Sequence, residues 1–260
     1  MTSETFGNEA ISNEASNEVS GEAIPNEFLS VRGLSCSYIS RPWGIFGKRE
    51  VKTVLNKVDL EIKRGEIYGL VGESGCGKTT LGKCILGLID YEGEILVNGR
   101  KRSRKPSFRE RREAAFEIQA VFQDSGASLN PVKTIGWILE EPLKAQRLGS
   151  ARERRIKVES MLELVGLDPS YKARKPHELS SGQKQRVSIG AALMLKPGLI
   201  VADEPVSALD VSVGAQILNL FRDLNSHLGL ALLFISHNLD LVNYLCDRSA
   251  VMRNGRLEEK

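Results

Sequence analysis

Hydrophobic and polar residues follow two different patterns along this chain. Solid apolar runs, each bounded by polar residues, occur at 67–71, 199–202 and 231–235. Runs of this kind are typical of strands that are buried on both faces of a parallel sheet. Alternation of apolar and polar residues, which predicts half-exposed strands, occurs at 28–31, 57–62 and 93–99. The combination predicts an α/β protein.

Helical patterns lie between two of the solid apolar runs. Residues 135–195 are mostly helical in pattern, and the apolar stretch 161–165 ends at Gly166, where a C-terminal cap is expected. A further helix is predicted to begin near Ser181. The runs at 199–202 and 231–235 each end at a polar or charged residue, which is where open α/β sheets place their ligand sites.

A glycine-rich segment follows the run 67–71. Residues 72–80, Gly-Glu-Ser-Gly-Cys-Gly-Lys-Thr-Thr, fit G-x-x-x-x-G-K-[ST]. The glycines allow a tight turn that aims backbone N–H groups at phosphate oxygens, and the helix N-terminus behind them adds positive charge. Lys78 is predicted to reach the β- and γ-phosphates, and the Thr79 hydroxyl to bind Mg²⁺. The predicted phosphate-binding residues are Gly72, Glu73, Ser74, Gly75, Cys76, Gly77, Lys78, Thr79 and Thr80. The helix behind them is predicted from Leu81, Cys84, Ile85 and Leu88.

Composition and charge narrow the class of protein. The chain has 260 residues, enough for one large or two small domains, and its formal net charge of +3 is too small to indicate a nucleic-acid partner. The sequence contains neither an apolar stretch near the roughly 20 residues that span a bilayer nor a secretory signal. We therefore expect a chain that is cytosolic or lies on the cytosolic side of another component. Its four cysteines show neither metal-type spacing nor a disulfide pattern.

Two charged segments stand apart from these patterns. Residues 1–27 carry Glu at positions 4, 9, 14, 18, 22 and 27 and no Lys or Arg. Such a segment cannot bury enough apolar surface to offset its ordering entropy, so it is predicted to be a disordered acidic tail. An inhibitory or partner-binding arm is the alternative. The basic run at 100–112 is predicted to be a solvated surface segment rather than a contact site for anionic lipid or nucleic acid.

Two adjacent carboxylates follow the run 199–202. Asp203 and Glu204 lie at a predicted strand end, where one carboxylate is suited to hold Mg²⁺ and its neighbour to orient or deprotonate a water. A pair of this kind alone usually marks a solvated strand end. Together with the phosphate-binding segment in the same predicted sheet, it favours a nucleotide-hydrolysing site.

The remaining motifs resemble those of ABC-transporter ATPases. Leu179-Ser-Ser-Gly-Gln183 resembles the signature of that family, and three further motifs occur in family order: Gln123 after Val121-Phe122, Ser207-Ala-Leu-Asp210 after Glu204, and His237 after Ile235-Ser236. The resemblance runs from about residue 30 to the end of the sequence. It implies a phosphate-loop NTPase (RecA-like) core with a small antiparallel β subdomain and an inserted helical subdomain, all within one ATP-binding domain spanning residues 28–260.

The resemblance also implies a role for each motif residue. Tyr38 would stack on adenine, and Gln123 would approach Mg²⁺ and the attacking water. Asp203 would hold Mg²⁺ through water, Glu204 would act as the base or orient the water, and His237 would contact the γ-phosphate. Each side chain alone has an ordinary structural explanation, such as a half-buried strand aromatic for Tyr38. Their order along the chain is what favours the catalytic roles, with Lys78 completing the catalytic set.

The resemblance implies that the site is shared between two subunits. Ser180, Gly182 and Gln183 would close over ATP held by the phosphate loop of a second ATP-binding subunit, and Asp210 would lie at the same interface. The signature usually reads LSGGQ, and Ser181 stands here in place of the first glycine. If the backbone at that position needs a positive φ, a non-glycine residue costs on the order of 1 kcal/mol.

Three segments indicate a branch of the family. The segments resemble those of ATPase subunits from importers of dipeptides, oligopeptides and nickel, and they comprise residues 122–131, 176–180 and 203–211. In that group two different ATPase subunits usually pair at the cytoplasmic face of the membrane, beneath two membrane-spanning permease subunits that are fed by an extracytoplasmic binding protein. The segment after Gln123 would dock on the permeases. Peptide import is favoured, with nickel or metallophore import as the alternative because the sequence lacks the C-terminal extension common among the peptide importers.

Two further alternatives are an ABC ATPase outside transport and a subunit that binds nucleotide but hydrolyses little of it. A non-transport ABC ATPase acting in translation or DNA repair is the first, although the chain shows neither tandem ATPase units nor a long coiled-coil insertion. A nucleotide-regulated subunit with little turnover is the second, and Glu204 and His237 argue against it.

Overall fold

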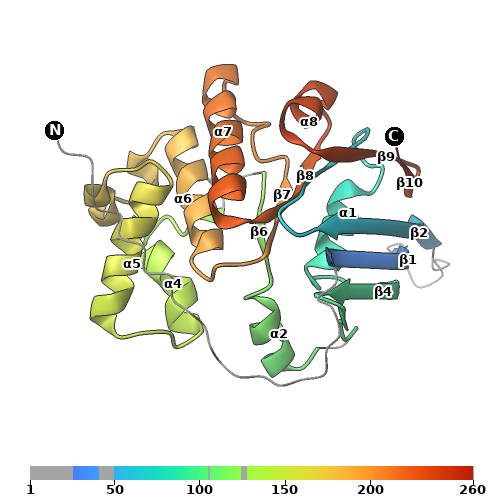
Figure 1. Cartoon of the computed structure of the whole chain (residues 1–260), viewed down its shortest axis with the longest axis horizontal. Coiled ribbons are helices and arrows are strands. Elements are labelled where there is room, and N and C mark those ends of the chain that lie inside the picture. Colours follow the sequence, from blue (N-terminus) through green and yellow to red (C-terminus); the bar gives the residue numbers. More distant parts are fainter. Residues whose placement is uncertain (1–25, 41–49, 105, 124–127, 260) are drawn as a thin grey trace, which may run out of the picture.

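Two β-sheets and a set of helices make up the computed structural model, which describes residues 26–40, 50–104, 106–123 and 128–259 (Figure 1). The strands are β1 Glu27–Ser40, β2 Glu50–Lys63, β3 Ile67–Val71, β4 Glu92–Val97, β5 Arg100–Lys101, β6 Ile118–Val121, β7 Leu199–Asp203, β8 Ala231–Ser236, β9 Arg248–Arg253 and β10 Arg256–Glu259. The helices are α1 Lys78–Ile85, α2 Phe108–Ala114, α4 Ile135–Ala145, α5 Ala151–Leu164, α6 Ser181–Leu193, α7 Val211–Leu228 and α8 Leu239–Leu245, with 3₁₀ turns η1 Pro169–Ala173 and η2 Pro176–Glu178.

The larger sheet has the strand order β10-β9-β3-β8-β7-β6. Its strands pair in parallel from β9 to β6, and only β10 is antiparallel to its neighbour. Every residue of β3, β7 and β8 is buried, because one face of this sheet packs against α6, α7 and α8 and the other against α1 and the strands β1, β2 and β4. The prediction of central parallel strands at 67–71, 199–202 and 231–235 is therefore confirmed.

The smaller sheet is antiparallel, with the order β2-β1-β4-β5. The three segments with alternating patterns lie in or at the end of β1, β2 and β4. The prediction of half-exposed strands is confirmed for 57–62 and 93–99. It is wrong for 28–31, where all four residues are buried, because β1 lies between β2 and β4 and this end of it also packs against the larger sheet. β1 and β2 each span 14 residues and are longer than predicted. Register shifts interrupt their pairing at several points, and each shift breaks the two-residue alternation on which the prediction relied.

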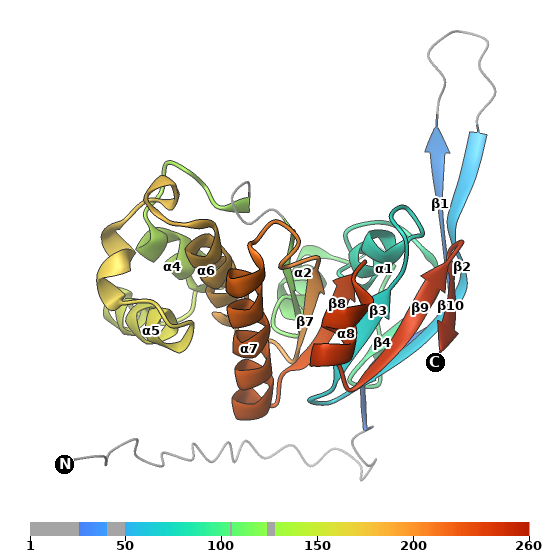
Figure 2. The same cartoon turned by 90° about the horizontal axis from the view of Figure 1, so that it is seen from above.

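The helices α4, α5 and α6 gather at one end of the molecule, opposite the antiparallel sheet, with the larger sheet between them (Figures 1 and 2). Gly166 ends α5 as predicted: its φ is +71°, and the N–H of Leu167 reaches the carbonyl of Leu162 at 2.8 Å. The helix predicted near Ser181 begins at that residue. This arrangement confirms the phosphate-loop NTPase fold with an antiparallel β subdomain and an inserted helical subdomain.

One predicted helical position is wrong. Leu81, Cys84 and Ile85 are fully buried on α1, but Leu88 is 61 % exposed and lies beyond the end of the helix. Gly87, with φ +69°, ends the helix before that point, and the N–H of Leu88 then bonds back to the carbonyl of Lys83.

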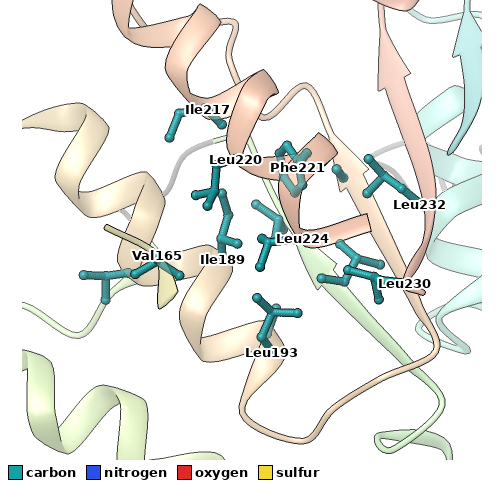
Figure 3. Close-up of a cluster of buried hydrophobic side chains, with 14 of the residues drawn as sticks. Val165, Ile189, Leu193, Ile217, Leu220, Phe221, Leu224, Leu230 and Leu232 are labelled. Atoms are coloured by element: carbon teal, nitrogen blue, oxygen red, sulfur yellow. The ribbon is translucent and has the colours of Figure 1, made fainter. Parts of the chain in front are cut away.

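The helical subdomain joins the sheet through one apolar cluster. Figure 3 shows side chains of α6 and α7 meeting those around β8. The buried members labelled there are Val165, Ile189, Leu193, Ile217, Leu220, Phe221, Leu224, Leu230 and Leu232. Because interiors of this kind are close-packed, this cluster holds the start of α6 at a defined position relative to the sheet.

The basic run is largely a surface feature, as predicted. The helix α2 that ends it contains no buried residue. Arg102 is the exception, since its side chain is 15 % exposed and pairs with Glu117 at 3.0 Å. Within the described ranges, no helix is both long enough and apolar enough to cross a membrane.

Candidate functional site

The glycine-rich loop connects the end of β3 to the start of α1, as predicted. Gly75 has φ +80° and Gly77 has φ +117°, conformations that side chains with a Cβ rarely adopt. A Cβ at position 72 would lie 2.4 Å from the carbonyl oxygen of Met252. The loop therefore needs glycine at all three positions, at two for conformation and at one for space.

Lys78 is folded back over this loop. The side chain is buried, and its Nζ donates to the carbonyl of Gly72 at 2.7 Å and to that of Glu73 at 2.9 Å. The third contact of Nζ is with Sγ of Cys76 at 3.9 Å, and because sulfur is a weak acceptor, a phosphate oxygen is able to replace it. With these neutral carbonyl partners, a positive charge is held at the mouth of a loop of backbone N–H groups, which is an anion-binding arrangement.

The C-terminal hairpin supports the loop from the other side. The N–H of Gly255 donates to the carbonyl of Cys76 at 3.0 Å, and its carbonyl accepts from the N–H of Asn56 at 2.9 Å. A pocket of about 520 Å³ opens here, lined by residues 71–76, His237, Leu239 and residues 251–254. Sequence reasoning missed this contribution, although Asn254-Gly255 between two strands is a strong hairpin signal.

Asp203 lies at the end of β7, facing the start of α1. Its side chain is buried, and one oxygen hydrogen-bonds to the Thr79 hydroxyl, while Oδ1 has no partner. Burial raises the pKa of Asp203, and repulsion from the carboxylate of Glu204 raises it further. A buried carboxylate oxygen without a partner, beside a hydroxyl, suits a hard divalent cation such as Mg²⁺.

Glu204 turns away from the strand direction. Its φ is +49°, a left-handed conformation that costs a non-glycine residue about 1–2 kcal/mol. The N–H of Glu204 donates to the carbonyl of Ile235 at 2.9 Å, which ties the turn to β8. One carboxylate oxygen lies 3.1 Å from Nδ1 of His237, just beyond the end of β8. These two residues, which lie 33 positions apart in the sequence, therefore meet at the ends of β7 and β8.

The residues at 180–183 lie at the start of α6, in the helical subdomain. Ser180 caps the helix and forms a capping box with Gln183. Ser181 is the first helical residue and is not among the residues with positive φ, so the strain considered for that substitution does not arise. Gly182 is the tighter position, because a Cβ there would lie 2.4 Å from Cγ1 of Val213 on α7.

Three other predicted site residues come from elements that do not form the loop. Tyr38 is 44 % exposed on β1 and pairs with Lys52 on β2. Gln123 is exposed, just after β6, and the four residues that follow it lie outside the described ranges, so the predicted docking of that segment is not described. Asp210 is an exposed residue that precedes α7.

The structure thus brings one group of predicted residues together and leaves another separate. The loop 72–80, Asp203, Glu204 and His237 meet at the carboxyl ends of β3, β7 and β8. Within the part of the chain that the structure describes, no hydrogen bond or ion pair links residues 180–183 to that group. The roles assigned to both groups stay predictions.

Comparison with known proteins agrees with this arrangement. The model of the family described as "ABC transporter" matches residues 55–207. A Brucella ovis protein whose name describes a peptide import ATP-binding protein is 48 % identical to this chain over 232 residues. The match covers 89 % of this chain and 71 % of the Brucella protein. The oligopeptide transport ATP-binding protein AppF of Bacillus subtilis is 47 % identical over 219 residues, covering 83 % and 66 %.

A solved structure shares the fold. An ATP-binding cassette determined as a dimer in a post-hydrolysis state, bound to ADP and Pi, superposes with a TM-score of 0.77 at 29 % identity, covering 89 % of this chain and 97 % of the other. The chain therefore belongs to the ABC transporter family, as one of its ATP-hydrolysing subunits.

Proposed function

We propose that this chain is the ATP-binding and ATP-hydrolysing subunit of an importer of dipeptides or oligopeptides. The observation that carries the proposal is the convergence of Lys78, Asp203, Glu204 and His237 on one glycine-rich loop. A cation, a buried carboxylate and a carboxylate–histidine pair are the parts that phosphoryl transfer to water needs.

The phosphate loop binds the nucleotide. Its N–H groups and Lys78 hold the β- and γ-phosphates, while Tyr38 provides an aromatic surface for adenine. Mg²⁺ would be held by Thr79, by Asp203 through water, and by Gln123, and by the phosphates of the nucleotide.

Glu204 acts on the attacking water. It accepts a proton from the water or orients it, and the 3.1 Å contact with Nδ1 of His237 fixes the carboxylate. His237, which is 57 % exposed, also contacts the γ-phosphate. General bases of this kind contribute about 10²–10⁴-fold to a rate.

The working unit contains two ATP-binding subunits. Ser180, Gly182 and Gln183 stand at the start of α6, where Ser180 is exposed, Gln183 is half-buried and Gly182 is buried against α7. They close over ATP bound to a second subunit, with Asp210 at the same interface. The dimeric state named for the solved cassette supports this arrangement. We propose that the second subunit is a different chain.

The remaining partners are two membrane-spanning permease subunits and an extracytoplasmic binding protein, with this chain bound peripherally at the cytoplasmic face. Closure of the two ATPase subunits moves the permeases because the ATP-bound state buries surface that the released state exposes. The names of the Brucella ovis and Bacillus subtilis relatives favour peptide over nickel or metallophore as cargo.

Capture from native membranes tests this proposal. The Glu204→Gln form with Mg-ATP is expected to hold the closed complex, and the Lys78→Ala form serves as the control that cannot bind ATP. Two multi-span subunits and a second ATPase, recovered with the first form and lost with the control, support the importer. Recovery of ribosomal or DNA-bound partners, or of no membrane protein, overturns it.

The cargo is tested on the reconstituted complex. Uptake of a labelled dipeptide into vesicles is expected to require ATP and to stop with Glu204→Gln. Uptake of Ni²⁺ with no uptake of peptide would replace peptide import by the metal alternative.

A further inference from the structure

Gln183 is held at both ends of its side-chain amide. Its Oε1 accepts from the N–H of Ser180 at 3.0 Å, and its Nε2 donates to the hydroxyl of Tyr171 at 3.1 Å. An oxygen that accepts from a backbone N–H fixes which end of the amide is which, so Nε2 faces Tyr171. The second N–H of Nε2 remains available to a ligand.

Tyr171 is itself fixed in place. It lies on η1, where Asp168 caps the turn by accepting from the N–H of Ser170 at 2.8 Å. The guanidinium of Arg174 stacks on the Tyr171 ring, 3.8 Å from its centroid. The ring also packs against the apolar cluster of the helical subdomain. Its hydroxyl is therefore a rigid point at which Gln183 can be anchored.

The same turn is joined to the start of α4. The carbonyl of Arg174 accepts from the N–H of Ile135 at 2.8 Å, and a Cβ at Gly136 would lie 3.0 Å from the carbonyl of Lys172. The turn that carries Tyr171 is thus held against the N-terminus of α4 by a hydrogen bond and by close backbone packing, which adds to the rigidity of the Tyr171 hydroxyl.

We propose that Tyr171 is a positioning residue, whose hydroxyl fixes the Gln183 amide and thereby holds the loop 180–183 in the shape that closes on nucleotide in the second subunit. This inference rests on the proposed function, because it assumes that residues 180–183 contact the nucleotide bound to a second subunit. Tyr171 acts through Gln183 and through the capping box with Ser180, and touches neither the nucleotide nor the reacting atoms.

Removal of the hydroxyl alone tests the proposal. Tyr171→Phe keeps the ring and its stacking with Arg174, and is expected to raise the KM for ATP about three- to tenfold, the factor that corresponds to one lost hydrogen bond. Turnover at saturating ATP is expected to stay within about twofold, since the reacting groups are untouched. An unchanged KM overturns the proposal.

Tyr244 provides a matched control. Its hydroxyl donates to the side-chain oxygen of Asn219 at 2.8 Å, and Arg222 stacks on its ring at 4.5 Å, so Tyr244→Phe removes the same group from a similar setting. Tyr244→Phe is expected to leave the KM unchanged. An equal rise in KM for both variants would show a general structural effect and overturn the assignment.

Coupling to Gln183 is measured with a double-mutant cycle. Once Gln183→Ala has removed the amide, Tyr171→Phe is expected to change the KM by less than about twofold. Effects that multiply in the double variant would show that Tyr171 does not act through Gln183.

A readout on the isolated full chain separates this inference from the proposed function. Tyr171→Phe is expected to speed hydrogen exchange of the Ser180 and Gln183 amides without a change in global unfolding, because both amides bond within the capping box. Unchanged exchange overturns the positioning role even if ATP-driven import is demonstrated. Faster exchange in Tyr171→Phe, together with no ATP-driven import by the wild-type complex, leaves the positioning role intact and overturns only the proposed function.

Discussion

The side chain of Asp203 lies in a buried position, which disfavours the negative charge of its carboxylate. Its carboxylate is buried at the end of β7, with Glu204 beside it and one oxygen unpartnered, and burial raises its pKa. Nothing in the fold requires this, since a neutral side chain could make the same hydrogen bond to Thr79. We infer that Asp203 lowers the free energy of unfolding relative to a neutral side chain, and that its carboxylate is present because it binds a cation.

Asp203→Asn is therefore expected to raise the unfolding free energy of the nucleotide-free chain at neutral pH. A raised folded pKa means that the native state binds the proton more tightly, so stability falls as pH rises from the unfolded value of about 4 through the folded value. The gain is expected to vanish near pH 4. Urea denaturation at several pH values measures it, with exposed Asp223→Asn as the control.

Asp203→Asn is also expected to lower the apparent affinity for Mg²⁺ in the presence of ATP by about 10–100-fold. This is the range found when a residue that supports a metal ligand is lost. Titration of Mg²⁺ at fixed ATP measures this. A variant that is more stable and binds Mg-ATP normally would contradict the assignment of Asp203 as a metal-holding residue.

Lys78 contributes to the site at the residue scale as well. Its ammonium is held by two loop carbonyls, so it is positioned before a ligand arrives. Lys78→Ala removes the ammonium group held over the loop and is expected to weaken ATP binding at least about 100-fold, equal to the roughly 3 kcal/mol of a strong charged hydrogen bond. Calorimetric titration measures the affinity, and Lys157→Ala on the exposed face of α5 is the control. Equal affinities would rule out the phosphate-binding role.

At the scale of elements, the contact between α6 and α7 explains which signature glycine is needed. Gly182 faces Val213 with no room for a Cβ, whereas Ser181 is exposed in the first turn of α6. Gly182→Ala is expected to destabilise the chain by about 1–3 kcal/mol through overpacking. Ser181→Gly is expected to change stability by no more than about 0.5–1 kcal/mol. Denaturant unfolding compares the two.

A second substitution distinguishes crowding from backbone effects. If crowding by Val213 is the cause, Val213→Ala is expected to recover most of the loss in the Gly182→Ala background. A loss that persists in the double variant, or a Ser181→Gly effect as large as that of Gly182→Ala, would contradict this explanation.

Elements with one strong local signal were predicted well, and contacts between distant elements were not. The burial of β3, β7 and β8 follows from three apolar runs, and the start of α6 follows from Ser180 and Gln183 within one turn. The support of the phosphate loop by Gly255 depends on the pairing of β9 with β3, which no local pattern reports. The bond between Tyr171 and Gln183 is likewise set by how η1 packs on α6, and Leu88 was misassigned because Gly87 was not recognised as a cap.

At the scale of the whole molecule, the first residues of β1 join the two sheets. Phe28 is buried against Gly198, where a Cβ would lie 2.2 Å from its ring, and Leu29 pairs with Val97 on β4. The preceding carbonyl, that of Asn26, accepts from the N–H of Arg64 at 3.2 Å. The described fold thus includes Asn26 and Glu27, two residues before the predicted boundary at 28, whereas the acidic segment up to residue 25 lies outside the described ranges.

This boundary predicts a sharp difference between two truncations. Removal of residues 1–25 is expected to change the melting temperature by no more than about 2 °C, because it removes no contact of the described fold. Removal of residues 1–31 also deletes Phe28, Leu29 and Val31, each of which contributes about 2–5 kcal/mol as a buried side chain, and is expected to abolish cooperative unfolding. If that truncation yields no protein, Phe28→Ala in the full chain is expected to cost about 3–5 kcal/mol. A large loss on removal of 1–25 would instead show that the acidic segment packs on the domain, in favour of the interacting-arm alternative.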